Sequence, residues 1–80
     1  MLTVRYFAGA RAAAGVAEDQ VPPGCTLHQL TATLVARRGE RLGRVLGTAS
    51  FLVDGLAWRD RDRPLPDPAV VDVLPPFAGG

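Results

Sequence analysis

The sequence predicts an α+β fold in which a mixed sheet of four to five strands packs on one main helix. Two segments with strand character lie at opposite ends of the chain, at residues 2–8 and 69–74. Asp54-Gly55 stands between apolar residues, which is a strong hairpin signal. A single helix signal dominates, at residues 26–38. Six or seven short elements around one helix favour a two-layer domain.

The first and last predicted strands each have one apolar face. In residues 2–8 the apolar face carries Leu2, Val4 and Tyr6, and the solvent-facing side carries Thr3, Arg5 and Phe7. In residues 69–74 Val71 and Val73 share one face, and the other carries Val70, Asp72 and Leu74. Successive side chains of a strand point to opposite faces of the sheet. We therefore expect both strands to be central, adjacent and parallel.

Short elements follow the first strand. Residues 9–16 are rich in Ala and close at Gly15, which predicts a connecting turn or one or two helical turns. Residues 18–22 are a plausible second strand, which Pro22-Pro23-Gly24 ends.

The helix at 26–38 has clear signals at both ends. Thr26 and Gln29 predict a capping box, because their side chains can satisfy each other's free backbone amides. Cys25 is expected to pack on Leu30 in front of the cap, which gives this cysteine a structural role. Gly39 suits a left-handed stop. The apolar stripe of the helix is Leu27, Leu30 and Leu34, with Val35 beside them.

The middle of the chain is predicted to be less regular. Residues 40–49 contain two glycines and are predicted to form a linker, pinned to the core by Leu42, Val45 and Leu46. Residues 51–58 predict a hairpin with a type I′ turn, with Phe51 and Val53 on one face and Leu52 on the other. Residues 59–63 alternate in charge and are interpreted as a solvated loop. Prolines at 64, 66 and 68 keep the next segment irregular.

Composition excludes several classes of function. A net charge of +1 gives no electrostatic footprint for nucleic acid or an anionic membrane, and no apolar run approaches the ~20 residues of a membrane span. One Cys excludes an internal disulfide and a cysteine-rich metal site. With no Lys and one each of His, Ser and Tyr, the chain offers few groups for catalysis. We expect a cytoplasmic carrier or subunit with no metal, no bound cofactor and no active site of its own.

The C-terminal segment is the most informative part of the chain, which we expect to form one domain, 1–80, with a flexible tail at 75–80. Pro75 and Pro76 lack amide donors, so the last strand cannot continue. From Pro75 onward the tail spans roughly 20 Å when extended. Gly79 and Gly80 lack side chains, so the tail suits a narrow channel. This favours chemistry at the Gly80 carboxylate: ATP would adenylate it, and a sulfur nucleophile would displace AMP to leave a thiocarboxylate. Since the sequence ends at Gly80, we expect no processing.

The chain resembles the β-grasp (ubiquitin-like) sulfur carriers of the MoaD/ThiS family over nearly its whole length, and most of all the MoaD branch, the small subunits of molybdopterin synthase. The resemblance rests on residues 4–8, on residues 51–55, and on a closing segment from Pro64-Leu65 to Pro75-Pro76-x-x-Gly79-Gly80. ThiS carriers resemble it in the fold and the diglycine, but tend to be shorter and lack the double proline. The chain departs from the family at Asp67-Pro68-Ala69-Val70, where an acidic Asp-Gly-Asp-Glu turn is frequent and would help to dock an activating enzyme.

This resemblance implies a function. An adenylyltransferase similar to the ubiquitin-activating enzymes would use ATP to activate Gly80. The tail would then enter a MoaE-like large subunit, which supplies the catalytic pocket, and pass sulfur to cyclic pyranopterin monophosphate in molybdenum cofactor biosynthesis. Two small subunits would flank a dimer of large ones, as a heterotetramer. Three alternatives stay open: a sulfur carrier for thiazole, cysteine or tRNA thiolation, a ubiquitin-like modifier of lysines, and a non-covalent binding module.

A docking surface can also be predicted. In a β-grasp sheet the last strand lies between the first strand and the hairpin. Phe7, Leu52 and Leu74 then point away from the helix on neighbouring strands and form one exposed apolar patch. Such a patch marks a partner site, here for both the activating enzyme and the large subunit. The tail residues Pro75, Pro76, Phe77, Ala78, Gly79 and Gly80 extend this contact.

Overall fold

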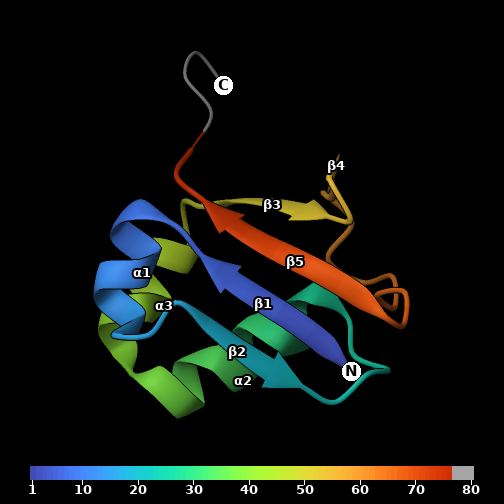
Figure 1. Ribbon diagram of the computed structural model, residues 1–80, viewed down its shortest axis with the longest axis horizontal. Helices are drawn as coiled ribbons and strands as arrows, with labels where there is room; N and C mark the ends of the chain where they lie inside the picture. Colours follow the sequence, from blue (N-terminus) through green and yellow to red (C-terminus); the bar gives the residue numbers. More distant parts are fainter. Residues whose placement is uncertain (77–80) are drawn as a thin grey trace.

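The computed structural model describes residues 1–76 and shows a five-stranded mixed sheet with its helices on one face (Figure 1). The strand order is β2-β1-β5-β3-β4. The elements follow the chain as β1 (Leu2–Tyr6), α1 (Ala8–Ala14), β2 (Glu18–Val21), α2 (Leu27–Arg38), α3 (Glu40–Leu46), β3 (Ser50–Val53), β4 (Leu56–Ala57) and β5 (Ala69–Leu74). The predicted α+β class is confirmed. Helix α2 is the main helix, and two shorter helices accompany it.

The two central strands are β1 and β5, which run parallel from the Leu2–Ala69 pair to the Tyr6–Val73 pair. The prediction for the first and last strands is therefore confirmed. Strand β5 also pairs with β3, so it is bonded to a neighbour on both sides. The core lies between the sheet and the helices, where the apolar faces of β1, β5 and β3 meet the apolar stripe of α2. Its fully buried members include Leu2, Val4, Val71, Val73, Leu27, Leu30 and Leu34.

The first strand is shorter than the predicted 2–8, because Phe7 begins the turn into α1. The Phe7 backbone is extended, with φ −124° and ψ 150°, and the Phe7 N–H still donates to the Val73 carbonyl at 3.1 Å. The short helix predicted in residues 9–16 is confirmed as α1. It ends at Gly15, whose φ of 79° is left-handed, as expected for a glycine in that position. The second predicted strand is confirmed as β2.

Both caps of α2 involve residues singled out in the sequence. The capping box is confirmed: the Gln29 N–H donates to Thr26 Oγ1 at 3.1 Å, and the Thr26 N–H donates to Gln29 Oε1 at 3.0 Å. Cys25 is half-buried and packs against the core. Gly39 ends the helix, but with φ 105° and ψ 174° rather than the left-handed helical geometry that was expected. This conformation leads directly from α2 into the next helix.

The predicted linker at 40–49 is wrong, since residues 40–46 form helix α3. Gly43, which suggested a loop, instead lies where α3 crosses α2. A Cβ at this position would come within 3.2 Å of Val35 Cγ2, so glycine permits the close approach of the two helices. The predicted packing of this segment on the core is confirmed, because Leu42 and Leu46 are buried and Val45 packs against the core.

The hairpin between β3 and β4 is confirmed. Asp54 and Gly55 both have positive φ, at 49° and 84°, as a type I′ turn requires. The turn is also tied to β5, because the Asp54 N–H donates to the Val70 carbonyl and Asp54 Oδ1 accepts the Val70 N–H, each at 2.9 Å. The following residues 59–63 are exposed and irregular, as expected of a solvated loop.

A buried ionic cluster joins the sheet to α2. Asp19 on β2 is 6% exposed. It accepts a hydrogen bond from the Tyr6 hydroxyl at 2.8 Å and forms a two-point ion pair with Arg38, while Arg37 Nη1 lies 3.4 Å from its Oδ1. The hydrogen bonds from Arg38 lower the pKa of Asp19 to about 2. Burial and the neighbouring carboxylate raise the pKa of Tyr6, which therefore remains a donor.

Candidate functional site

The C-terminal tail leaves the fold from the middle of the sheet. At the end of β5, Leu74 pairs with Ser50 of β3, and Val73 accepts the Phe7 N–H. Pro75 and Pro76 follow and are exposed. Having no N–H groups, they cannot extend the pairing with either neighbouring strand. Figure 1 shows the C-terminal end of β5 between the end of β1 and the start of β3. The predicted site residues Phe77, Ala78, Gly79 and Gly80 lie outside the described residues.

The structure places Phe7, Leu52 and Leu74 on the sheet face that points away from the helices. We call these three residues the outer-face patch. Phe7 is 38% exposed, and Leu52 and Leu74 are half-buried. Leu74 is on the central strand β5, Leu52 is on its neighbour β3, and Phe7 directly follows its other neighbour, β1. Their geometry suits a docking surface, and their role in binding stays a prediction.

An ion pair lies within this face. Arg5 Nε is 2.6 Å from Asp72 Oδ1, and Arg5 Nη2 is 2.9 Å from Asp72 Oδ2. The guanidinium also stacks on the Phe7 ring, with 5.7 Å between its carbon and the ring centroid. Asp72 raises the pKa of Arg5 through the hydrogen bonds and the opposite charge. Sequence reasoning missed this pair. The signal was present, because parallel pairing of the first and last strands sets Arg5 opposite Asp72.

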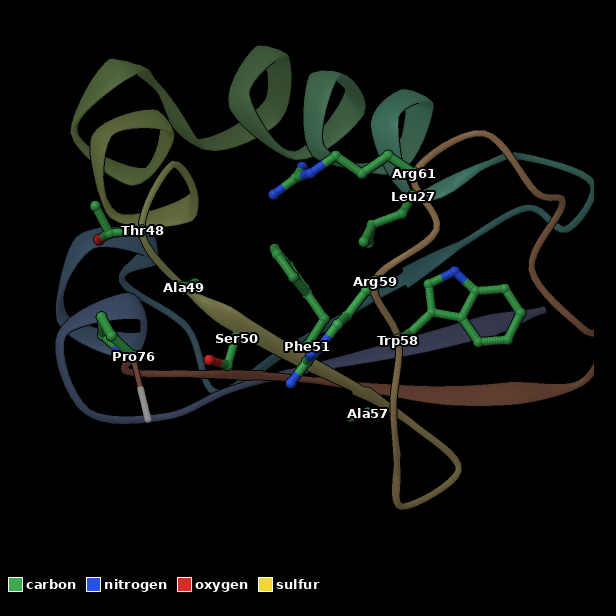
Figure 2. A pocket seen from close by; sticks show the side chains of 10 residues that line it. All are labelled: Leu27, Thr48, Ala49, Ser50, Phe51, Ala57, Trp58, Arg59, Arg61 and Pro76. Carbon is green, nitrogen blue, oxygen red and sulfur yellow. The ribbon is translucent and has the colours of Figure 1, made fainter. Parts of the chain in front are cut away.

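A hollow of about 330 Å³ opens beside the start of the tail (Figure 2). We call it the tail-root pocket. It forms where the β3–β4 hairpin and the loop after β4 meet the N-terminal end of α2. Sequence reasoning did not find it, because its residues are distant in the chain and its arginines were interpreted as part of a solvated loop. Its lining residues are Leu27, Thr48, Ala49, Ser50, Phe51, Ala57, Trp58, Arg59, Arg61 and Pro76.

The described residues offer little other chemistry. Within residues 1–76, no group of three His, Cys, Asp or Glu side chains is placed to hold a metal ion. Burial raises the pKa of the Cys25 thiol, so this residue is a poor nucleophile at neutral pH. No helix in the same part of the chain is long and apolar enough to cross a membrane. Two surfaces lie beside the start of the tail and are candidates for binding, the outer-face patch and the tail-root pocket.

Comparisons with known proteins identify the family and the fold of this chain. The sequence profile of the ThiS family matches residues 4–80. A putative molybdopterin converting factor subunit 1 from Pyrococcus furiosus is 28% identical, with a TM-score of 0.79 over 95% of this chain and 97% of that one. In a complex of subunits 1 and 2 of the molybdopterin-converting factor from Helicobacter pylori, the matching chain is 25% identical, with a TM-score of 0.71 over 99% and 97% of the two chains.

A third solved structure shares the fold at lower identity. The small archaeal modifier protein 1 of Methanosarcina acetivorans is 24% identical, with a TM-score of 0.76 over 99% of this chain and 95% of that one. No curated protein matches the sequence. The β-grasp fold implied by the sequence resemblance is confirmed by these likenesses. The family match covers nearly every residue. The chain therefore belongs to the ThiS family, whose members are ubiquitin-like sulfur carriers similar to ThiS and MoaD.

Proposed function

We propose that this chain is the sulfur carrier subunit of a molybdopterin synthase. The observation that carries the proposal is its likeness to two molybdopterin-converting factor subunit 1 chains, at 28% and 25% identity over at least 95% of its length. The family match also extends through Gly79 and Gly80, where the chemistry would take place.

The reaction begins at the Gly80 carboxylate. A separate adenylyltransferase binds ATP, the carboxylate attacks the α-phosphorus, and pyrophosphate leaves. A sulfur nucleophile then attacks the acyl carbon and displaces AMP, which leaves a thiocarboxylate. The thiocarboxylate sulfur attacks a carbon of cyclic pyranopterin monophosphate and displaces the oxygen bound to that carbon, and water then cleaves the acyl–sulfur bond to restore the carboxylate. Two thiocarboxylated carriers supply the two sulfurs of the dithiolene. The carrier contributes only its terminus, and because activation consumes ATP we assign the process to the cytoplasm.

The partner in the final step would be a large subunit, as in the Helicobacter pylori complex of subunits 1 and 2. Pro75 and Pro76 hold the start of the tail extended, so Phe77, Ala78, Gly79 and Gly80 would enter the partner's channel. The outer-face patch would bind the large subunit and, at another stage, the adenylyltransferase. Use of one face by both proteins makes the two complexes mutually exclusive. The expected assembly with the large subunit is a heterotetramer.

Intact mass spectrometry of the untagged chain tests the carrier chemistry. The chain is incubated with ATP, a sulfide source and the adenylyltransferase from the same genome. We expect the mass to change by the replacement of one oxygen with sulfur, and the change to disappear when Gly79 and Gly80 are deleted. Cys25→Ser is the matched control, because it removes the one thiol that could carry sulfur as a persulfide. Sulfur that stays on the deletion variant but is lost from Cys25→Ser would overturn the proposal.

A further inference from the structure

The two arginines of the tail-root pocket are available to bind a partner, whereas several other arginines are bonded to groups within the chain. Arg5 and Arg38 each bind a carboxylate through two nitrogens, and Arg37 donates to the Gln20 carbonyl. Among residues 1–76, by contrast, Arg59 and Arg61 take part in no ion pair and no side-chain hydrogen bond. Two guanidinium groups without an anion therefore line one hollow.

The loop that carries these arginines is fixed to the fold. The Arg61 carbonyl accepts the His28 N–H at 3.1 Å, at the start of α2. The Asp60 carbonyl accepts the Trp58 indole N–H at 2.7 Å, and the Asp60 carboxylate accepts the Asp62 N–H at 3.0 Å. A loop that is already ordered loses less entropy when a ligand binds to its side chains.

The pocket combines positive charge with an apolar floor. Figure 2 shows the Arg61 side chain on the helix side of the Phe51 ring and the Arg59 side chain on its β3 side, near Ser50. The Arg61 guanidinium lies 5.8 Å from the centroid of the buried Phe51 ring. An acidic side chain matches this arrangement, because its methylene groups can lie on the floor while its carboxylate meets the two guanidinium groups.

The position of the pocket indicates which partner protein supplies that acidic side chain. Pro76 belongs both to the pocket lining and to the start of the tail. A protein that takes up the tail from Pro76 onward therefore meets the rim of the pocket. We propose, on the basis of the function proposed above, that the tail-root pocket receives an Asp or Glu side chain of the large subunit, held by Arg59 and Arg61. This contact adjoins the start of the tail and would fix the direction in which the tail enters.

The test compares two double charge reversals. Arg59→Glu/Arg61→Glu alters the pocket, and Arg41→Glu/Arg44→Glu makes the same charge change on exposed residues of α3 outside it. Titration calorimetry measures the Kd for the large subunit from the same genome, after circular dichroism has shown that both variants fold. We expect the pocket variant to bind roughly tenfold or more weakly. We expect the α3 variant to bind within about twofold of the natural chain, and Arg59→Gln/Arg61→Gln to show an intermediate loss.

A charge swap identifies the contact itself. One Asp or Glu of the large subunit changed to Arg is expected to restore the affinity of Arg59→Glu/Arg61→Glu while weakening that of the natural chain. Equal affinities for the pocket and α3 variants would overturn the inference. Binding of inorganic phosphate to the free chain, lost in the pocket variant without any change in the Kd for the large subunit, would also overturn it. If the natural chain does not bind the large subunit at all, the proposed function fails instead.

Discussion

Arg5 and Asp72 form a two-point ion pair across the parallel strands β1 and β5, with distances of 2.6 and 2.9 Å. Arg5 also stacks on Phe7, and Asp72 is opposite Leu52 on β3, so the pair lies inside the outer-face patch. A partner that covers this face meets both apolar groups and an ion pair whose charges already neutralise each other. The apolar groups would then supply affinity, and the ion pair would restrict which partners fit.

The stability of this pair can be separated from its role in binding. Arg5→Met leaves the carboxylate of the buried residue Asp72 without its partner, so we expect a clear fall in the urea midpoint. Arg5→Met/Asp72→Leu replaces both charges with apolar groups and is expected to regain most of the loss. Equilibrium urea unfolding of the two variants and the natural chain measures this. A double variant less stable than the single one would contradict the account.

The outer-face patch is expected to be a binding surface rather than part of the core. Phe7→Asp/Leu74→Asp should keep the fold, because Phe7 precedes α1, where Asp is a favourable cap. We expect it to weaken binding of the large subunit by roughly 30-fold or more. Leu56→Asp is the control, since Leu56 is 73% exposed and lies outside the patch. Surface plasmon resonance gives the affinities of the natural chain, the double variant and Leu56→Asp for the large subunit. An unchanged Kd for the double variant would exclude the patch as the binding surface.

Acid should weaken the fold through Asp19. Its pKa is lowered from 3.8 to about 2 in the folded chain, so folding favours the charged form. The stabilisation is complete above the unfolded-state pKa and is lost as the pH falls from about 4 towards 2. The shift corresponds to roughly 2 kcal/mol of unfolding free energy. Urea unfolding between pH 6 and pH 2 is expected to show this loss in the natural chain and less of it in Asp19→Asn. An identical pH dependence in both would contradict the assignment.

The crossing of α2 and α3 predicts coupling between Gly43 and Val35. Alanine favours a helix over glycine by about 1 kcal/mol, but the added methyl would meet Val35 Cγ2 at 3.2 Å. We expect Gly43→Ala to stabilise the chain by about 1 kcal/mol in a Val35→Ala background and by clearly less in the natural one. A double-mutant cycle from urea unfolding measures the difference. Additive effects within about 0.3 kcal/mol would show that the two residues do not constrain each other.

The sequence predicted the features that depend on local patterns. Strand alternation identified the buried faces of β1 and β5, and the Thr26 and Gln29 spacing identified the start of α2. It failed where a residue's role depends on a distant neighbour. Gly43 indicated a loop because its contact with Val35 on another helix is invisible in the local pattern. For the same reason, the arginines of residues 59–63 gave no sign of the pocket that Pro76 and Phe51 help them form.

Sulfur transfer to the pterin tests the central claim most directly. The thiocarboxylated chain is mixed with the large subunit and cyclic pyranopterin monophosphate, and its intact mass is followed beside the pterin products. The account predicts that the carrier returns to the mass of its carboxylate form while a dithiolene pterin appears. A thiocarboxylate that persists beside bound large subunit would contradict the synthase assignment, and would direct attention to a thiazole, cysteine or tRNA acceptor.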